Sequence, residues 1–174
     1  GRTGRRATAQ RERHSIGFPA DPLWYKDAVI YELHVGTFNP PAGRPPGVFA
    51  DVIARLPYLR DLGVTAIELM PVAEFAGAYS WGYNPSHHFA VSRVYGGSEG
   101  LADLVAAAHA VSIAVILDVV YNHFGPQDLD LWRFDGWHQH SLGGLYFYND
   151  WRARTPWDEK TRPDFHERIQ LLLY

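Results

Sequence analysis

The chain of 174 residues contains no cysteine, which excludes disulfide bonds and thiolate metal sites. Without cysteine, the sequence gives no indication of the redox compartment. No apolar run reaches the roughly 18 residues that a membrane-spanning helix needs. Residues 1–20 also lack the apolar segment of a secretory signal. We therefore expect a cytoplasmic protein with no membrane partner.

The chain also has no large excess of positive or negative charge. It contains 16 basic and 19 acidic residues, and its formal net charge is only -3. This balance predicts no nucleic-acid partner for the body of the protein. Hydrophobic residues make up 47% of the chain, which is enough to build a core. Aromatic residues make up 14%, which fits core packing as well as flat surfaces on which a ligand stacks.

The N-terminal segment differs from the rest. Residues 1–20 contain five arginines, a single acidic residue, Glu12, and little that is apolar. We expect residues 1–22 to form a disordered or linker arm. No aromatic residues interleave with the arginines, which argues against a tail that binds nucleic acid.

Three near-continuous apolar segments predict strands buried on both faces, over residues 28–35, 65–70 and 113–120. Between them, apolar residues recur at steps of three and four over 49–62 and 101–111, which is typical of amphipathic helices. This order of strands and helices predicts two consecutive βαβ units and a parallel sheet.

Local signals refine these boundaries. Pro57 lies inside the first helical pattern and should kink the helix or restart it. Ser98 is the expected N-cap of the second helix. Between the second strand and that helix, residues 73–97 are expected to form a long loop.

A doubly wound sheet and a barrel begin alike, and the loop after the first strand distinguishes them. Residues 39–46 hold four prolines and no Gly-x-Gly-x-x-Gly sequence, so a dinucleotide-binding fold is weakly supported. At the C-terminal end of the third strand, polar side chains gather at Asp118, Tyr121, Asn122 and His123. Parallel α/β enzymes place their active sites at such strand ends, so we expect a functional site here.

The chain does not proceed directly to a third helix. Residues 121–162 are rich in aromatic residues and irregular in pattern, which indicates a functional loop or a small inserted subdomain. From residue 163 a helical pattern resumes and reaches residue 174 without a stop signal. We expect residues 163–174 to begin a helix that the end of the chain truncates.

These motifs resemble the α-amylase superfamily, glycoside hydrolase family 13. The sequence Asp118-Val-Val-Tyr-Asn-His123 is similar to the family's first signature region, at the end of the third barrel strand. Tyr31-Glu-Leu-His-Val35, Trp81-Gly-Tyr83 and Tyr95-Gly-Gly97 match further motifs in the same order. The match covers roughly residues 24–174.

The resemblance implies an α/β fold, namely an incomplete TIM (β/α)8 barrel. Its first three strands would lie within residues 23–120, and residues 121–162 would be the insertion after strand three. A complete barrel needs ~250 residues, so the resemblance implies the N-terminal part of the catalytic barrel only.

The resemblance also implies substrate-binding residues. His123 would hydrogen-bond sugar hydroxyls, because a neutral imidazole offers one donor and one acceptor. Tyr83 would be the flat surface on which that sugar stacks, and Trp81 belongs to the same motif. Asp118 would orient neighbouring polar groups. Asn122 is a calcium ligand in some amylases, but branching-type members often lack the ion, so we expect no cofactor and assign no metal ligand.

The family's chemistry is retaining and uses two carboxyl groups about 5–5.5 Å apart. In family members the nucleophile follows strand four, the acid/base strand five, and a stabilising aspartate strand seven. Glu32, Glu68 and Asp118 lie on strands one to three and match none of these positions. We therefore expect no catalytic residue within this chain, and an isolated 174-residue chain that is inactive.

Within the family, the sequence is most similar to glycogen branching enzymes and malto-oligosyltrehalose trehalohydrolases. Residues 145–157 favour the branching group, so we expect transfer of α-1,4 chains to a 6-hydroxyl of an α-glucan such as glycogen or starch. The alternatives are trehalose release by a trehalohydrolase, another amylase-type hydrolase or a debranching enzyme. An alternative of a different class is a non-catalytic glucan-binding fragment.

Overall fold

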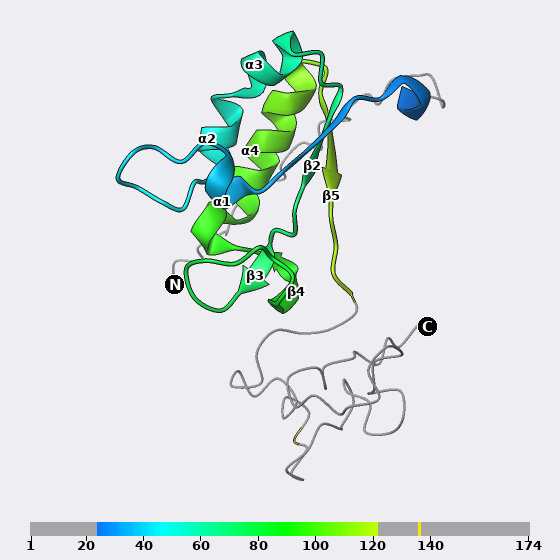
Figure 1. Cartoon of the computed structure of the whole chain (residues 1–174). Helices are drawn as coiled ribbons and strands as arrows, with labels where there is room; N and C mark the ends of the chain where they lie inside the picture. The colour runs from blue at the N-terminus through cyan, green and yellow to red at the C-terminus, as the bar shows by residue number, and fades with distance from the viewer. Residues whose placement is uncertain (1–23, 122–135, 137–174) are drawn as a thin grey trace, which may run out of the picture.

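The computed structural model describes residues 24–121 and 136 (Figure 1). The arm predicted over residues 1–22 lies outside these residues. So do the helix start predicted over 163–174 and, apart from residues 121 and 136, the insertion predicted over 121–162.

Three parallel strands form the main sheet, in the order β1 (Ile30–Leu33), β2 (Ala66–Leu69) and β5 (Ala114–Leu117). Tyr31 lies opposite Ile67, which in turn lies opposite Val115. The predicted parallel arrangement is confirmed. Each strand is shorter than the apolar segment that predicted it, and the residues at the ends of each segment lie outside the paired strand.

Helices follow the first two strands. A short α1 (Val35–Phe38) comes after β1. The helical pattern predicted over residues 49–62 forms two helices, α2 (Phe49–Ile53) and α3 (Leu56–Asp61). Pro57 lies in the first turn of α3. Backbone N–H groups in the first turn of a helix have no hydrogen-bond partner within the helix, so the absence of this group in proline costs nothing there. The predicted restart at this proline is therefore confirmed.

The second predicted helix is α4 (Gly97–Ala110), and its start differs from the prediction. Its N-cap is Gly96, with φ at +113°, and Ser98 lies inside the first turn. The Ser98 prediction was wrong because a side-chain cap was assumed. The chain instead enters the helix through a left-handed residue, which glycine adopts without steric cost.

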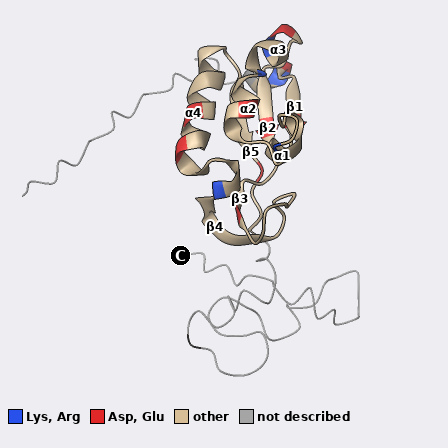
Figure 2. Ribbon diagram, turned by 90° about the vertical axis from the view of Figure 1, so that its left-hand side faces the viewer, with Lys and Arg blue, Asp and Glu red and all other residues tan. Residues whose placement is uncertain are grey.

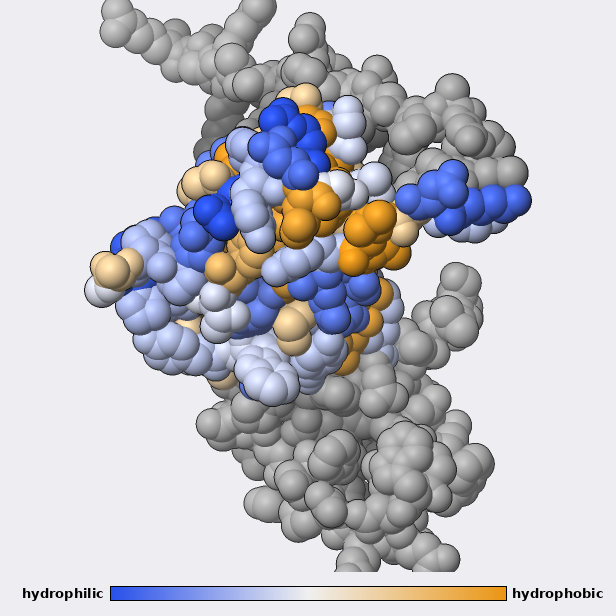
Figure 3. Space-filling model, turned by 45° about the horizontal axis from the view of Figure 1, so that its top comes forward, coloured by the Kyte–Doolittle hydropathy of each residue, from blue (hydrophilic) through white to orange (hydrophobic). Residues whose placement is uncertain are grey.

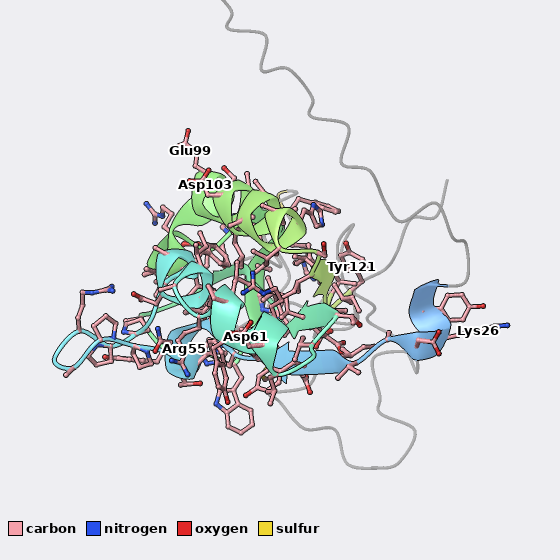
Figure 4. The ribbon with its side chains drawn as sticks, turned by 90° about the horizontal axis from the view of Figure 1, so that it is seen from above. Lys26, Arg55, Asp61, Glu99, Asp103 and Tyr121 are labelled. Atoms are coloured by element: carbon pink, nitrogen blue, oxygen red, sulfur yellow. The ribbon has the colours of Figure 1, made fainter. Side chains whose placement is uncertain are left out.

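The helices lie on one side of the sheet (Figure 1), and the hydrophobic core is formed by residues of these helices and of the strands. Figure 4 looks down on the layers and shows Glu99 and Asp103 pointing outward from α4. Acidic residues mark the same outer side of α4 in Figure 2. The buried core residues are Leu33, Val35, Phe49, Val52, Leu56, Leu59, Val64, Ile67, Leu69, Val72, Phe75, Tyr95, Leu104, Ala108 and Ile113.

The prediction that all strands are buried on both faces was wrong for β1 and β5 within the described part of the chain. Ile30 and Leu117 are 51% and 43% exposed. β1 and β5 are the two outer strands of the described sheet, and the described helices cover only one of its faces. Hydrophobic residues lie among hydrophilic ones on the face drawn in Figure 3.

The expected loop over residues 73–97 contains regular structure, which corrects the prediction. β3 (Ala73–Phe75) pairs antiparallel with β4 (Pro85–Val91), and a 3-10 helix, η2 (Arg93–Tyr95), follows. A further 3-10 helix, η1 (Trp24–Asp27), precedes β1. In Figure 1 the β3–β4 pair lies below the main sheet, at the end toward which β5 points.

Candidate functional site

The C-terminal ends of the parallel strands meet at one edge of the sheet. His34 directly follows β1, Pro71 comes shortly after β2, and Asp118 directly follows β5. The backbone N–H of Asp118 donates to Leu69 O at 3.0 Å. The backbone of Asp118 is therefore still hydrogen-bonded to β2, although the residue lies just beyond the end of β5. The residues that follow the three strands therefore lie at the same edge of the sheet.

The turn between β3 and β4, residues 80–84, contacts all three strand ends. Its most direct contact joins Tyr83 to Asp118, with the phenol hydroxyl donating to Asp118 Oδ2 at 2.7 Å. Both residues were predicted to bind substrate, and the structure brings them together.

The Tyr83–Asp118 contact changes the acidity of the phenol. The hydrogen bond to Asp118 is the main reason that the pKa of Tyr83 rises from 10.0 to about 12, with burial and the negative charges of Asp118, Glu32 and Glu68 adding to it. The hydroxyl is thus a permanent donor near neutral pH. Tyr83 is nonetheless 40% exposed, which leaves part of its ring accessible.

The carboxylates near Tyr83 share one face of the sheet. Glu32 and Glu68 are opposite each other in the β1–β2 register. Asp118 lies two residues beyond Ile116, the β5 residue opposite Glu68, and strand alternation places it on that same face. This face is turned away from the helices, so the surroundings of Tyr83 are negatively charged.

The middle of the turn packs on the end of β2. Gly82 has φ at +93°, and a Cβ added to it would lie 2.1 Å from the carbonyl oxygen of Pro71. Only glycine accommodates both this backbone conformation and this close approach. The sequence Trp81-Gly82-Tyr83 therefore has a structural reason for its central residue.

The beginning of the turn is fixed at Ser80. His34 Nε2 lies 2.8 Å from the carbonyl oxygen of Ser80, and the Tyr95 hydroxyl donates to the same oxygen at 3.1 Å. The Ser80 hydroxyl accepts from Gly82 N–H at 2.9 Å and donates to the side chain of Asn84. Sequence reasoning assigned no site role to His34, Ser80 or Tyr95, although His34 and Tyr95 stand in quoted family motifs and His34 stands at a strand end.

The remaining predicted residues have different outcomes. Trp81 is on the turn and 74% exposed. His123 and Asn122 lie outside the described residues, so the sugar-binding role expected of His123 stays a prediction.

Two general features bear on the kind of site. Within residues 24–121 and 136, no group of three or more histidine and acidic side chains is arranged to hold a metal ion. In the same part of the chain, no helix is both long enough and apolar enough to cross a membrane.

In a comparison with protein families, residues 23–166 match the catalytic domain of alpha amylase. A malto-oligosyltrehalose trehalohydrolase from Saccharolobus solfataricus is 47% identical over 132 residues, which are 76% of this chain and 21% of that protein. Further proteins of the same name match at 38% to 50% identity. The 1,4-alpha-glucan branching enzyme GlgB from Pseudomonas aeruginosa is 43% identical over 126 residues, 70% of this chain and 17% of that enzyme.

Among solved structures, a Salmonella typhimurium protein described as an alpha amylase superposes with a TM-score of 0.60 at 38% sequence identity. The superposition covers 82% of this chain and 20% of that one. The chain thus spans about a fifth of the length of the proteins that it matches.

Proposed function

The chain belongs to the alpha-amylase catalytic-domain family, as part of a (β/α)8 barrel, and on that premise we propose that its protein is an α-glucan-active hydrolase. The specific activity that we propose is release of trehalose from malto-oligosyltrehalose. The 47% identity to a trehalohydrolase supports this activity. It takes precedence over the branching activity that residues 145–157 favoured, since the identity to that trehalohydrolase is higher than the 43% identity to a branching enzyme.

The structural observation that carries the proposal of an α-glucan-active site is the hydrogen bond from Tyr83 to Asp118 at the C-terminal edge of the sheet. It joins two family motifs, Trp81-Gly-Tyr83 and the segment that begins at Asp118. We propose that this edge forms one wall of a sugar-binding cleft.

In this cleft, Tyr83 would serve as a platform for a pyranose ring. The hydrogen bond from its hydroxyl to Asp118 restrains the position of the ring, and its 40% exposure leaves aromatic surface for the C–H groups of a sugar. Trp81, which is 74% exposed, would supply additional aromatic surface further along the turn.

Asp118 would position groups rather than react. Its carboxylate accepts a hydrogen bond from the Tyr83 hydroxyl, and we propose that it also orients Asn122 and His123, which follow in the same motif. His123 would then hydrogen-bond sugar hydroxyls. We propose no metal role for Asn122, and no catalytic role for Glu32 or Glu68, whose positions match none of the family's catalytic carboxylates.

A second candidate is 1,4-α-glucan branching, supported by the 43% identity to a branching enzyme. The two activities differ in the acceptor, which is water for hydrolysis and a glucan 6-hydroxyl for branching. The described strand ends concern the sugar donor, so they are compatible with both. A third candidate is glucan binding without turnover, for which Tyr83 alone would suffice.

The test uses the full-length protein as its gene encodes it. Incubation with malto-oligosyltrehalose should release trehalose, and incubation with amylose should create no new α-1,6 branch points. Branch points without trehalose would instead support the second candidate, and binding of maltoheptaose without any product would support the third. Tyr83→Ala should lower turnover strongly, whereas Tyr79→Ala, at a 70% exposed tyrosine in the same loop, should leave it nearly unchanged.

A further inference from the structure

The turn that carries Tyr83 is held at its other end, Ser80, by two side chains. These are His34, which follows β1, and Tyr95, which comes from η2. Both contact the carbonyl oxygen of Ser80, His34 Nε2 at 2.8 Å and the Tyr95 hydroxyl at 3.1 Å. The two residues also contact each other, at 2.9 Å between Nε2 and the hydroxyl.

The chemistry of the acceptor fixes the proton positions in this group. A carbonyl oxygen only accepts, so Nε2 of His34 must carry a hydrogen and the Tyr95 hydroxyl must point its hydrogen at Ser80. Nδ1 of His34 lies 3.1 Å from the Thr37 hydroxyl, which donates to it in the neutral ring. Each partner therefore has a complementary role, and both lone pairs of the Ser80 carbonyl are used.

The Tyr95 donor is itself immobile. Its ring is 1% exposed and packs against Phe49 and Phe75, at centroid distances of 6.1 and 5.6 Å. Burial also raises the pKa of its phenol to about 12, so the donor stays protonated. Ser80 is thus tied to the hydrophobic core through one side chain and to the end of β1 through the other.

From Ser80 the constraint passes along the turn to Tyr83. The Ser80 hydroxyl accepts from Gly82 N–H at 2.9 Å, and Gly82 packs against Pro71. Tyr83 is the next residue, and its hydroxyl reaches Asp118. The turn therefore contacts the chain after β1, β2 and β5 in succession, and the anchor at Ser80 includes one side chain of the core, that of Tyr95.

We propose that His34 and Tyr95 are positioning residues, which hold the Ser80 carbonyl so that the turn over residues 80–84 presents Tyr83 to the sugar. The inference rests on the proposed function only for the role of Tyr83. The anchoring of the turn is independent of it.

The test measures amide hydrogen exchange and maltoheptaose affinity in the full-length protein. Tyr95→Phe removes one donor and keeps the ring. His34→Leu removes the other, and His34→Gln restores an N–H donor near the position of Nε2. We expect Tyr95→Phe and His34→Leu to speed exchange at Gly82 by roughly tenfold, with Leu69 in β2 unchanged, and to weaken maltoheptaose binding. His34→Gln should recover most of both losses.

A matched control is Tyr58→Phe, at a 47% exposed tyrosine of α3, which should alter neither measurement. Equal acceleration at Gly82 and Leu69 would overturn the proposal, because the pair would then merely stabilise the fold. Unchanged exchange at Gly82 would also overturn it.

If Tyr83→Ala weakens maltoheptaose binding while His34→Leu speeds exchange at Gly82 without weakening that binding, the positioning role fails and the sugar platform stands. If Tyr83→Ala has no effect on binding, the platform fails, and faster exchange at Gly82 alone still supports the anchor.

Discussion

The hydroxyl of Tyr83 lies 2.7 Å from a carboxylate oxygen of Asp118, across 35 positions of sequence. This contact joins the β3–β4 turn to the end of β5, so the position of one aromatic ring depends on two distant parts of the chain. It also places a neutral donor against a carboxylate on the charged face of the sheet. The acidity of Tyr83 therefore reports directly on the geometry of the site.

The first prediction concerns alkaline titration. Tyr83 has a pKa raised to about 12, mainly by its hydrogen bond to Asp118, whereas an unfolded tyrosine ionises near 10.0. Because the folded pKa is the higher one, the contact contributes its full stability below pH 10 and loses it as the pH rises from about 10 to 12. The phenolate absorbance difference between wild type and Tyr83→Phe should show this late ionisation. Asp118→Asn should move it back toward 10, and an unmoved titration would contradict the assigned cause.

The second prediction concerns Gly82, and Gly63 provides a matched control. Both glycines have φ at +93°, so alanine at either should cost about 1 kcal/mol of backbone strain. A Cβ at Gly63 has no neighbour within 4 Å, whereas a Cβ at Gly82 would lie 2.1 Å from Pro71 O. Gly82→Ala should therefore lower the free energy of unfolding by at least ~2 kcal/mol more than Gly63→Ala, measured by urea denaturation. Equal effects would show that the turn does not pack on β2.

The third prediction compares two aspartates. Asp51 accepts from Val48 N–H at 2.8 Å at the start of α2, and both of its oxygens lie 2.9 Å from Arg44 Nη2. Its side chain is only 13% exposed. Asp51→Ala should therefore cost about 1–2 kcal/mol of unfolding free energy, because it removes a helix-start acceptor. Asp61, 70% exposed and paired with its neighbour Arg60, serves as the control. Asp61→Ala should change stability by less than ~0.5 kcal/mol.

The main sheet could be predicted from sequence because its signals are local. Continuous apolar runs gave the three strands, and a proline inside a helical pattern gave the break between α2 and α3. The β3–β4 hairpin escaped prediction because β3 is only three residues long and β4 begins with Pro85 and carries two histidines. Short strands of this kind owe their conformation to pairing, which a local pattern does not contain.

The candidate site was predictable only in part. Tyr83 and Asp118 were selected by their family motifs, and the structure joins them. The contact between His34 and Ser80 joins residues 46 positions apart. It involves the main-chain carbonyl of Ser80, which every residue type has, so the identity of residue 80 could not predict it. Long-range contacts to backbone atoms depend on the fold as a whole, and they are the part that sequence patterns do not provide.

The last prediction tests whether Tyr83 and Asp118 act as one unit in sugar binding. Tyr83→Phe keeps the ring but loses the hydroxyl, and Asp118→Asn keeps the shape but loses the charge. If the hydroxyl serves only to orient the ring on Asp118, either change should weaken maltoheptaose binding by about 1 kcal/mol, and the double variant should be no weaker than the worse single variant. Isothermal titration calorimetry on the full-length protein measures the three affinities against wild type. Additive losses would mean that the two side chains contact the sugar separately, and that the 2.7 Å hydrogen bond does not determine how the ring is presented.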